Sequence, residues 1–198
     1  MEVFLEILGF VVGLLYLWWE YHADKKVWLA SVVMPAISMW LYFRKGLYAD
    51  FAINIYYLVI AVYGFMVWNR GKGRKVKGEN EATAPEARPI THTPAGVWIG
   101  VVCAALILWG VIRWVLVSFT DSTVPLADAF TTALSIVGLW MMARKYAEQW
   151  LVWLVVDIVC AGLYWYKGLP FYCILYSIYT VIAWFGYRKW VRMIHTPE

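Results

Sequence analysis

A single carboxylate lies in the most apolar part of the sequence. Asp157 stands within the stretch 150–166, WLVWLVVDIVCAGLYWY. Trp150, Trp153 and Asp157 follow an i, i+3, i+7 spacing, which places them on one face of a helix. Two indoles and a carboxylate on one face suit a flat aromatic cation, through stacking, cation–π attraction and charge. The alternatives are an interfacial aromatic belt for the indoles and an interhelical hydrogen bond for the carboxylate.

The composition identifies the surroundings of this helix as a lipid bilayer. Of the 198 residues, 63% are hydrophobic and only 15% are charged, whereas soluble domains are about half apolar and about a quarter charged. Aromatic residues make up 19% of the chain, and many lie near the ends of apolar blocks, which is typical of the two membrane interfaces. The three cysteines and three histidines have no metal-ligand or catalytic spacing. We therefore expect neither enzymatic activity, nor a metal, nor a cofactor.

Seven apolar blocks are long enough to cross a bilayer as helices, since about 20 residues cover roughly 30 Å of hydrocarbon. They are residues 3–21, 27–43, 48–68, 96–119, 125–143, 149–166 and 170–188. A transmembrane β-barrel would instead need short strands of alternating polarity. The predicted fold class is an all-α integral membrane protein with seven transmembrane helices. Thr93 and Pro94 are expected to cap and open the fourth helix.

The distribution of basic residues predicts the orientation in the membrane. With seven spans, thirteen of the 17 Lys and Arg residues fall on one side, in the loops after the first, third and fifth spans and in the tail. The positive-inside rule then places the N-terminus outside and the C-terminus in the cytoplasm. The basic tract 70–77 is interpreted as part of this topology signal, so no nucleic-acid partner is expected.

The chain repeats itself after about 122 residues. The matched positions are Trp28 and Trp150, Lys45-Gly46-Leu47 and Lys167-Gly168-Leu169, Gly64 and Gly186, and Trp68 and Trp190. Shared apolar composition does not explain why a turn, a glycine and a tryptophan all align under one shift. The first three spans therefore correspond to the last three, and the fourth span joins them.

This duplication predicts the organisation and the class of function. The expected parts are a first repeat (1–68), a cytoplasmic loop (69–95), a linker transmembrane helix (96–119), a second repeat (125–190) and a cytoplasmic tail (191–198). Parallel repeats related by an axis along the membrane normal occur in transporters, where the substrate site lies at the repeat interface. The sequence thus indicates a small-molecule transporter.

Further polar side chains stand in the third and seventh spans. Asn54 with Tyr57, and Tyr176 with Tyr179, are i, i+3 pairs that match each other under the same shift. Each pair could present hydrogen-bonding groups from one helix face toward the other half, with ordinary packing of the tyrosines as the alternative.

The sequence also predicts roles for three more residues in or near the spans. Glu20 ends the first span and is either interfacial or part of a cytoplasmic gate. Pro35, the repeat counterpart of Asp157, is expected to act as a hinge in its helix. Asp128 lies near an outer end and is expected to be solvated.

Three segments carry a resemblance to a known family. They are LLYLWWEY (14–21), FRKGLYADFAINIYYLVIAVYGFMVW (43–68) and EQWLVWLVVDIVCAGLYWYKGLPFYCILYSIYTVIAWFGYRKW (148–190). Over nearly its whole length the chain resembles the PnuC family of bacterial vitamin transporters, with the W-x-x-W pair as the most specific element. The resemblance implies a 3+1+3 bundle similar to a full-length SWEET sugar transporter, located in the bacterial inner membrane as a homotrimer.

The resemblance also implies a substrate and a set of binding residues. The implied activity is uptake of nicotinamide riboside by facilitated diffusion, with trapping inside the cell by phosphorylation. The implied binding residues are Trp150, Trp153, Asp157, Asn54, Tyr57, Tyr176 and Tyr179. Nicotinamide riboside carriers of the family have Gln in place of Asn54, and Glu20 is similar to a thiamine-linked sub-branch, PnuT. A thiamine uniporter is therefore the first alternative, and an ion-coupled transporter that uses Asp157 is the second.

Overall fold

A computed structural model describes residues 15–32, 35, 39, 48–69, 89–120, 122–168 and 170–195. The chain divides into two compact units, Met1–Pro89 and Ile90–Glu198, which we describe separately. The described residues are helical apart from turns, short loops and one isolated β-bridge. The all-helical architecture expected from the sequence is therefore confirmed.

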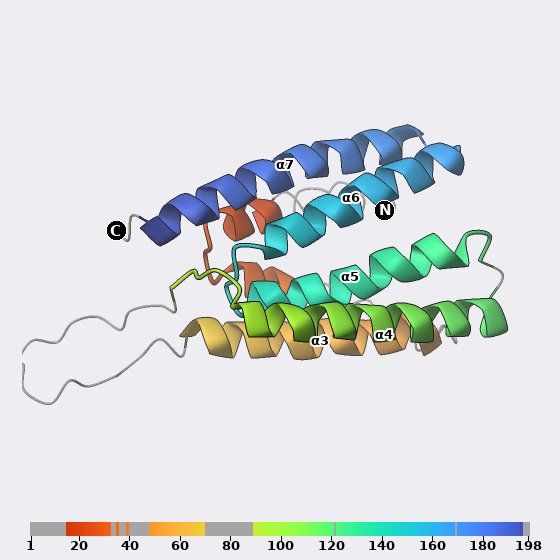
Figure 1. Cartoon of the computed structure of the whole chain (residues 1–198), viewed down its shortest axis with the longest axis horizontal. Coiled ribbons are helices and arrows are strands. Elements are labelled where there is room, and N and C mark those ends of the chain that lie inside the picture. Colours follow the sequence, from red (N-terminus) through yellow and green to blue (C-terminus); the bar gives the residue numbers. More distant parts are fainter. Residues whose placement is uncertain are drawn as a thin grey trace, which may run out of the picture. The chain divides into compact units, whose positions relative to one another are not determined.

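The helices begin and end close to the predicted positions. In the first unit, helical segments cover 15–21 and 27–32, followed by α3 (Tyr48–Asn69). The second unit contains α4 (Ala95–Phe119), α5 (Pro125–Ala143), α6 (Gln149–Tyr166) and α7 (Pro170–His195) (Figure 1). The predicted spans 125–143 and 149–166 agree with α5 and α6, whereas α7 continues to His195 instead of ending at 188. The predicted spans 3–21 and 27–43 lie partly outside the described residues.

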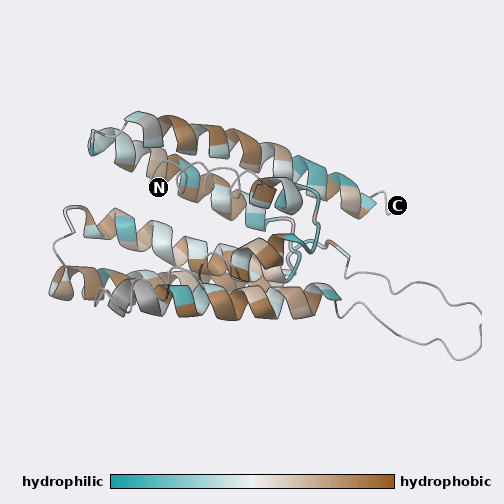
Figure 2. Cartoon of the chain, turned by 180° about the vertical axis from the view of Figure 1, so that it is seen from behind, coloured by the Kyte–Doolittle hydropathy of each residue, from teal (hydrophilic) through white to brown (hydrophobic). Residues whose placement is uncertain are grey.

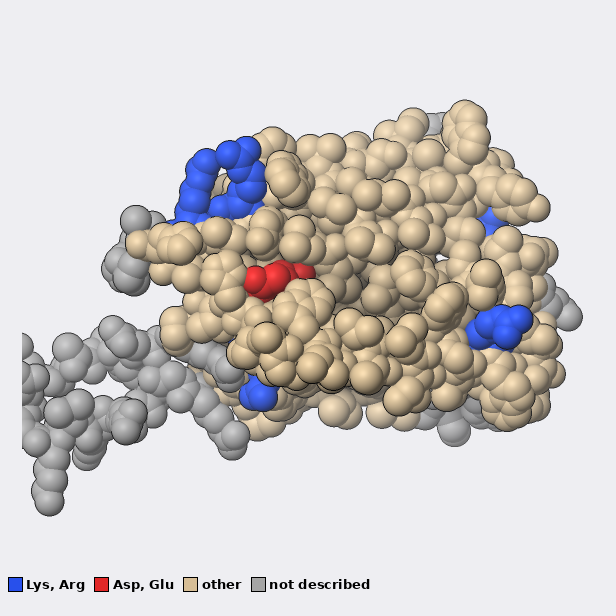
Figure 3. All heavy atoms as spheres, in the orientation of Figure 1, with Lys and Arg blue, Asp and Glu red and all other residues tan. Residues whose placement is uncertain are grey.

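Three helices of the second unit have the length and apolarity of membrane spans, namely α4, α5 and α6. Apolar residues cover the middle of the helices, and hydrophilic ones gather toward the C-terminal end of α7 (Figure 2). On the face shown in Figure 3, most of the surface is uncharged and the Lys and Arg side chains lie toward the helix ends. A central apolar band between charged ends is the pattern that a bilayer requires.

Within the second unit, successive helices pack against each other: α4 on α5, α5 on α6, and α6 on α7. The core between α4, α5 and α6 contains Val101, Val137, Met141, Tyr146 and Val152. Val101 is the one residue of α4 that is buried. Most of the apolar surface of α4 is consequently open to lipid or to another protein chain.

Both units contain the same sharp turn, in the first unit between the helical segments 15–21 and 27–32 and in the second unit between α5 and α6. Ala23 and Lys145, which are 122 positions apart, both have positive φ, at 52° and 56°. The N–H of Ala23 bonds to the Glu20 carbonyl oxygen, and the N–H of Lys145 bonds in the same way to that of Met142. Both turns therefore end the preceding helix with a Schellman-type pattern, in which a non-glycine residue adopts the left-handed conformation.

A second shared feature of the two units is a tryptophan packed on a glycine. A Cβ added at Gly186 would lie 2.6 Å from Cδ2 of Trp150. Trp150 in turn meets Trp190 edge-on, with ring centroids 5.9 Å apart. The first unit has the same edge-on contact between Trp28 and Trp68, at 5.5 Å.

The corresponding glycine of the first unit also lies against an indole. A Cβ at Gly64 would overlap the ring of Trp28. Only glycine allows either indole to lie flat against the backbone of the neighbouring helix. Both buried indole nitrogens, in Trp28 and Trp150, lack a hydrogen-bond partner within the described part of the chain.

The predicted cap of the fourth helix is wrong in detail. The N-cap of α4 is Pro94, and no side chain caps this helix end. The hydroxyl of Thr93 instead donates to the carboxylate of Glu148, at 2.8 Å. A capping hydroxyl would accept a hydrogen bond from a backbone N–H of the first turn, whereas this hydroxyl donates a charge-assisted bond to a carboxylate.

Candidate functional site

The site candidates of the second unit lie on α6 and α7, and all but Trp153 lie where these two helices meet. On α6, Trp150, Trp153, Asp157, Cys160 and Tyr164 recur at intervals of three and four residues. On α7, Tyr172, Tyr176, Tyr179, Ala183 and Gly186 do the same. The two rows face each other: Tyr164 of α6 stacks on Tyr176 of α7, and the ring of Trp150 of α6 packs on Gly186 of α7. We call this contact the α6–α7 seam.

Asp157 lies in the middle of α6 and is 7% exposed. Among the described residues, its carboxylate has no hydrogen-bond or ion-pair partner. Tyr176 and Tyr179 of α7 are close enough to interact electrostatically with it. A buried carboxylate without a partner is costly inside a membrane and marks a functional position by default.

The tyrosines of the seam form a continuous series of ring contacts. Tyr164 of α6 stacks on Tyr172 and on Tyr176 of α7, with centroids 5.1 and 5.2 Å apart and interplanar angles of 26° and 21°. Tyr176 then meets Tyr179 edge-on, at 5.7 Å. The series runs from the loop between α6 and α7 to the neighbourhood of Asp157. Tyr164 and Tyr172 were not predicted as site residues. Their seven-residue spacing from Asp157 and from Tyr179 could have indicated that they lie on the same helix faces.

The two tryptophans of the W-x-x-W pair have different surroundings. Trp150 is 2% exposed and is enclosed by Gly186 and Trp190. Trp153 is only partly buried and lies beside Gly138 of α5, where a Cβ would be 3.5 Å from its ring. Its indole N–H is buried and has no hydrogen-bond partner within the described residues. The ring of Trp153 therefore lies beside α5, whereas the ring of Trp150 packs between α6 and α7.

The remaining predicted residues belong to the first unit. Glu20 is 3% exposed and interacts with Tyr16. Asn54 on α3 is also buried, at 9% exposure, and Tyr57 is partly buried beside Tyr56. Burial of an acid and an amide on apolar helices indicates polar positions that the fold keeps away from lipid.

A polar clasp, which sequence reasoning missed, lies before α6. Glu148 accepts a hydrogen bond from Nδ1 of His92, at 2.6 Å, and bonds from the N–H and hydroxyl of Thr93, both at 2.8 Å. Thr91 forms an isolated parallel bridge with Tyr146, in which its N–H donates to the carbonyl oxygen of Lys145 and its own carbonyl oxygen accepts from the N–H of Ala147. The clasp therefore ties the segment before α4 to the start of α6.

The clasp also changes the acidity of its carboxyl group. Burial alone raises the pKa of Glu148, but the hydrogen bonds from His92 and Thr93 together outweigh it and hold the pKa below its ordinary value. No short-range sequence pattern reveals this contact, because His92 and Thr93 precede Glu148 by 56 and 55 residues.

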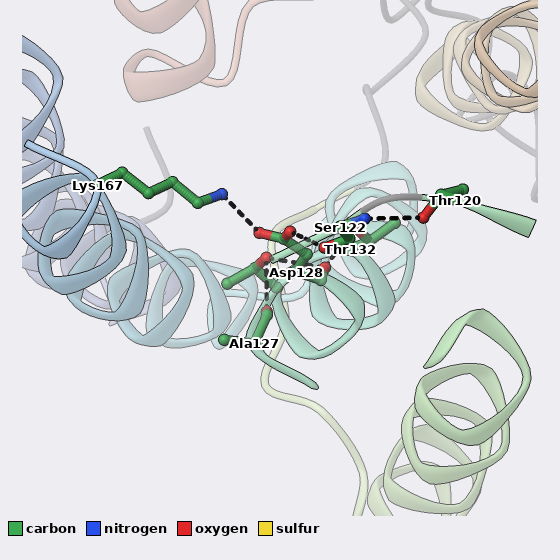
Figure 4. A network of polar contacts seen from close by, with 7 residues as sticks. Thr120, Ser122, Ala127, Asp128, Thr132 and Lys167 are labelled. Atoms are coloured by element: carbon green, nitrogen blue, oxygen red, sulfur yellow. Dashed lines mark hydrogen bonds and ion pairs between the residues drawn. The ribbon is translucent and has the colours of Figure 1, made fainter. Parts of the chain in front are cut away.

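The expectation that Asp128 is merely solvated is wrong. Its carboxylate lies 3.2 Å from Nζ of Lys167 and accepts a hydrogen bond from the hydroxyl of Ser122 at 2.8 Å (Figure 4). The pair joins the start of α5 to the end of α6, because Lys167 follows α6 directly. Each side chain of the ion pair is 31% exposed, so solvent still reaches it.

Known proteins with similar sequences and folds are membrane transporters. The family model described as nicotinamide mononucleotide transporter matches residues 3–192. A nicotinamide riboside transporter PnuC of Neisseria mucosa is 25% identical over 84% of this chain, and the chain spans only 64% of that relative's length. The Escherichia coli PnuC is 22% identical, with 95% of this chain and 85% of the relative covered.

Two further comparisons extend the picture. A riboflavin/roseoflavin transporter, RibM, of Streptomyces davaonensis is 28% identical over 67% of this chain and 59% of its own length. A crystal structure of the vitamin B3 transporter PnuC has the same fold, with a TM-score of 0.66 and 24% identity over 93% of this chain and 79% of that one. The resemblance noted from the sequence is thereby confirmed: the chain belongs to the nicotinamide mononucleotide transporter family, whose members include the PnuC proteins.

Proposed function

We propose that this protein takes up nicotinamide riboside across the bacterial inner membrane. The observation that carries the proposal is the carboxylate of Asp157, which is buried in α6 beside tyrosines of α7 and has no hydrogen-bond or ion-pair partner among the described residues. The pyridinium ring of nicotinamide riboside is flat and positively charged. It can stack on aromatic rings, and its charge can compensate the buried carboxylate of Asp157.

Charge also separates the candidate substrates. The relatives include carriers named for nicotinamide riboside and one named for riboflavin and roseoflavin. Riboflavin is neutral and would leave the Asp157 carboxylate uncompensated, which is unfavourable in a low-dielectric site. Thiamine is a flat cation as well, so it remains the competing substrate that the carboxylate accommodates equally.

The proposed site extends to the binding residues expected from the sequence. Trp153 would donate its buried indole N–H to the substrate, and Tyr176 and Tyr179 would line the side of α7. Asn54 and Tyr57 would contribute from the first repeat, and Glu20 would line the cytoplasmic gate. Trp150 would act indirectly, because its ring is enclosed between α6 and α7.

The proposed architecture is two parallel repeats joined by α4, as in a 3+1+3 bundle. The matched turns at Ala23 and Lys145 and the matched glycines Gly64 and Gly186 support this arrangement. Repeats that rock about a shared site allow a carrier to expose it alternately to either side. We propose facilitated diffusion, with the N-terminus outside, because the basic residues concentrate on the opposite side.

A homotrimer is the proposed assembly, with α4 as the helix available for contacts between copies. Its side chains are open to the surroundings, with Ile99 exposed at 70% and Ile107 at 66%. Gly96 and Gly100 have open space at their Cα atoms, so that another helix could approach closely. Mass measurement of the detergent-solubilised protein tests this: a purely monomeric species across micromolar concentrations contradicts it.

Transport into proteoliposomes tests the function. Vesicles without ATP and without ion gradients should accumulate labelled nicotinamide riboside until the two sides reach equal concentrations. Thiamine and riboflavin, offered in parallel, identify the substrate by the ratio of their initial rates. Asp157→Asn should lower uptake of the cation at least tenfold, since loss of a buried charge partner costs more than about 1.4 kcal/mol.

The same assay separates the mechanisms. Uptake that requires a proton or sodium gradient in the wild type, and that loses this requirement in Asp157→Asn, would identify an ion-coupled transporter. Wild-type vesicles that take up neither nicotinamide riboside nor thiamine would refute the proposed function altogether. Cys103→Ser, at an exposed position of α4, serves as a matched control for handling and reconstitution.

A further inference from the structure

One end of the α6–α7 seam is closed by packing and the other is not. Near the start of α6, Trp150 is 2% exposed and Trp190 is fully buried. Near the loop between α6 and α7, Tyr172 is 51% exposed and Tyr164 is only partly buried. Exposed tyrosines near a helix end are also typical of a membrane interface, but here they form a stack whose open end a ligand can reach.

The exposed rings are arranged as a stacking platform. Tyr164 stacks on both Tyr172 and Tyr176, at interplanar angles of 26° and 21°. Both α7 rings therefore already stack on a flat aromatic ring. Stacks of this kind bind flat ligands with little dependence on hydrogen bonds, and a positive charge on the ligand adds a cation–π attraction.

The nearby lysine does not compete for these ring faces. Lys167 directly follows α6, three residues after Tyr164, so that its ammonium group could reach a ring face of the stack. Asp128 holds that ammonium group instead, at 3.2 Å (Figure 4). A cationic substrate thus meets aromatic faces and a neutralised pair rather than a free positive charge.

We propose that Tyr164, Tyr172 and Tyr176 form a second, outer binding subsite for a flat aromatic cation, passed on the way to Asp157. The proposal rests on the proposed function for the identity of the cation. The ring contacts lead from this subsite through Tyr179 to the carboxylate, so that each step exchanges one aromatic partner for the next.

Substitution of the outermost ring tests the subsite. Tyr172 is half exposed, so its variants should fold. Initial uptake of nicotinamide riboside below its KM should rank Tyr172→Leu lowest, Tyr172→Phe near the wild type and Tyr172→Trp highest. Each step should be about threefold to fivefold, because Trp binds cations best through its face and Leu has no face. Tyr164→Leu should lower uptake by about fivefold to tenfold, as it removes the central ring.

Two controls separate this role from packing and from general damage. Tyr166→Leu changes a tyrosine of the same helix that is 77% exposed and outside the stack, and it should leave uptake within twofold of the wild type. Equilibrium binding to the purified protein, measured by quenching of tryptophan fluorescence, should change less than twofold in Tyr172→Leu, because the Asp157 site is intact.

The outcomes are distinguishable. Equal uptake by the Leu, Phe and Trp variants at position 172, with an active wild type, overturns the outer subsite and leaves the proposed function standing. An uptake loss that Tyr166→Leu shares equally overturns it as well. A wild type that neither binds nor takes up the cation overturns the proposed function itself, together with this inference.

Discussion

Replacement of Gly186 by alanine should destabilise the protein through the ring of Trp150. An added Cβ would lie 2.6 Å from Cδ2 of that ring. Ordinary contacts begin at about 3.4 Å, so the indole or the helix must move by nearly 1 Å. Neighbours restrict this movement, because Trp150 is 2% exposed and meets Trp190 edge-on.

The magnitude follows from two opposed effects. Overpacking of a tight core costs about 1–3 kcal/mol. Alanine is favoured over glycine inside a helix by roughly 1 kcal/mol. Gly162 of α6 provides the matched control, since a Cβ there meets no atom within 4 Å. Gly162→Ala should therefore be stabilised by the higher helix propensity of alanine, with no packing cost. The gain in helix propensity is common to both variants and cancels, so they should differ by the overpacking cost of about 1–3 kcal/mol in the free energy of unfolding.

Thermal unfolding in detergent checks this difference. For a chain of this length, 1 kcal/mol shifts Tm by about 2–4 °C, so Gly186→Ala should melt about 2–12 °C below Gly162→Ala. Gly64→Ala should behave like Gly186→Ala, because its Cβ would overlap the ring of Trp28. Should Gly186→Ala melt at or above Gly162→Ala, the glycine–indole contact is not what holds the two helices together.

Three further variants address the turns and polar contacts. Ala23→Gly should raise Tm by about 2–4 °C, because glycine adopts the positive φ at this turn without the cost of roughly 1 kcal/mol that alanine bears; an unchanged or lower Tm would contradict it. Glu148→Gln should cost about 1–2 kcal/mol at neutral pH. Since the folded pKa of Glu148 lies below 4.5, this stabilisation is complete above pH 4.5 and is lost as the pH falls through the lowered value. The Tm difference between wild type and variant should thus shrink in acid, and a constant difference down to pH 3 would refute the assignment. Asp128→Asn should lower Tm by less than about 3 °C, with a smaller effect at high salt, because its pair with Lys167 is partly exposed.

The helix bounds of the second unit could be predicted from sequence because charged turns and prolines separate the apolar blocks. Pro125 at the first position of α5 is one such signal. The turns at Ala23 and Lys145 could not be predicted, since neither residue favours a left-handed conformation on its own. Their geometry follows from tertiary packing, which outweighs local preference.

The candidate site was partly predictable for a similar reason. Asp157 stands out because a carboxylate among apolar residues violates the expected pattern. Tyr164 and Tyr172 do not stand out, because tyrosines are common at membrane interfaces and the stack depends on how α6 and α7 meet. The clasp of Glu148 depends on a segment 55 residues away and leaves no trace in a local pattern.

The paired tryptophan–glycine contacts have a consequence for redesign of the substrate range. In a duplicated chain, each position of one repeat can be compared with the equivalent position of the other, and positions that are the same in both are expected to be required by the fold. The two halves agree where Gly64 and Gly186 receive an indole. They differ at Asp157, whose counterpart is Pro35, and at Tyr176, whose counterpart is Asn54. A mutant library aimed at new vitamins should therefore keep the positions that agree and vary those that differ.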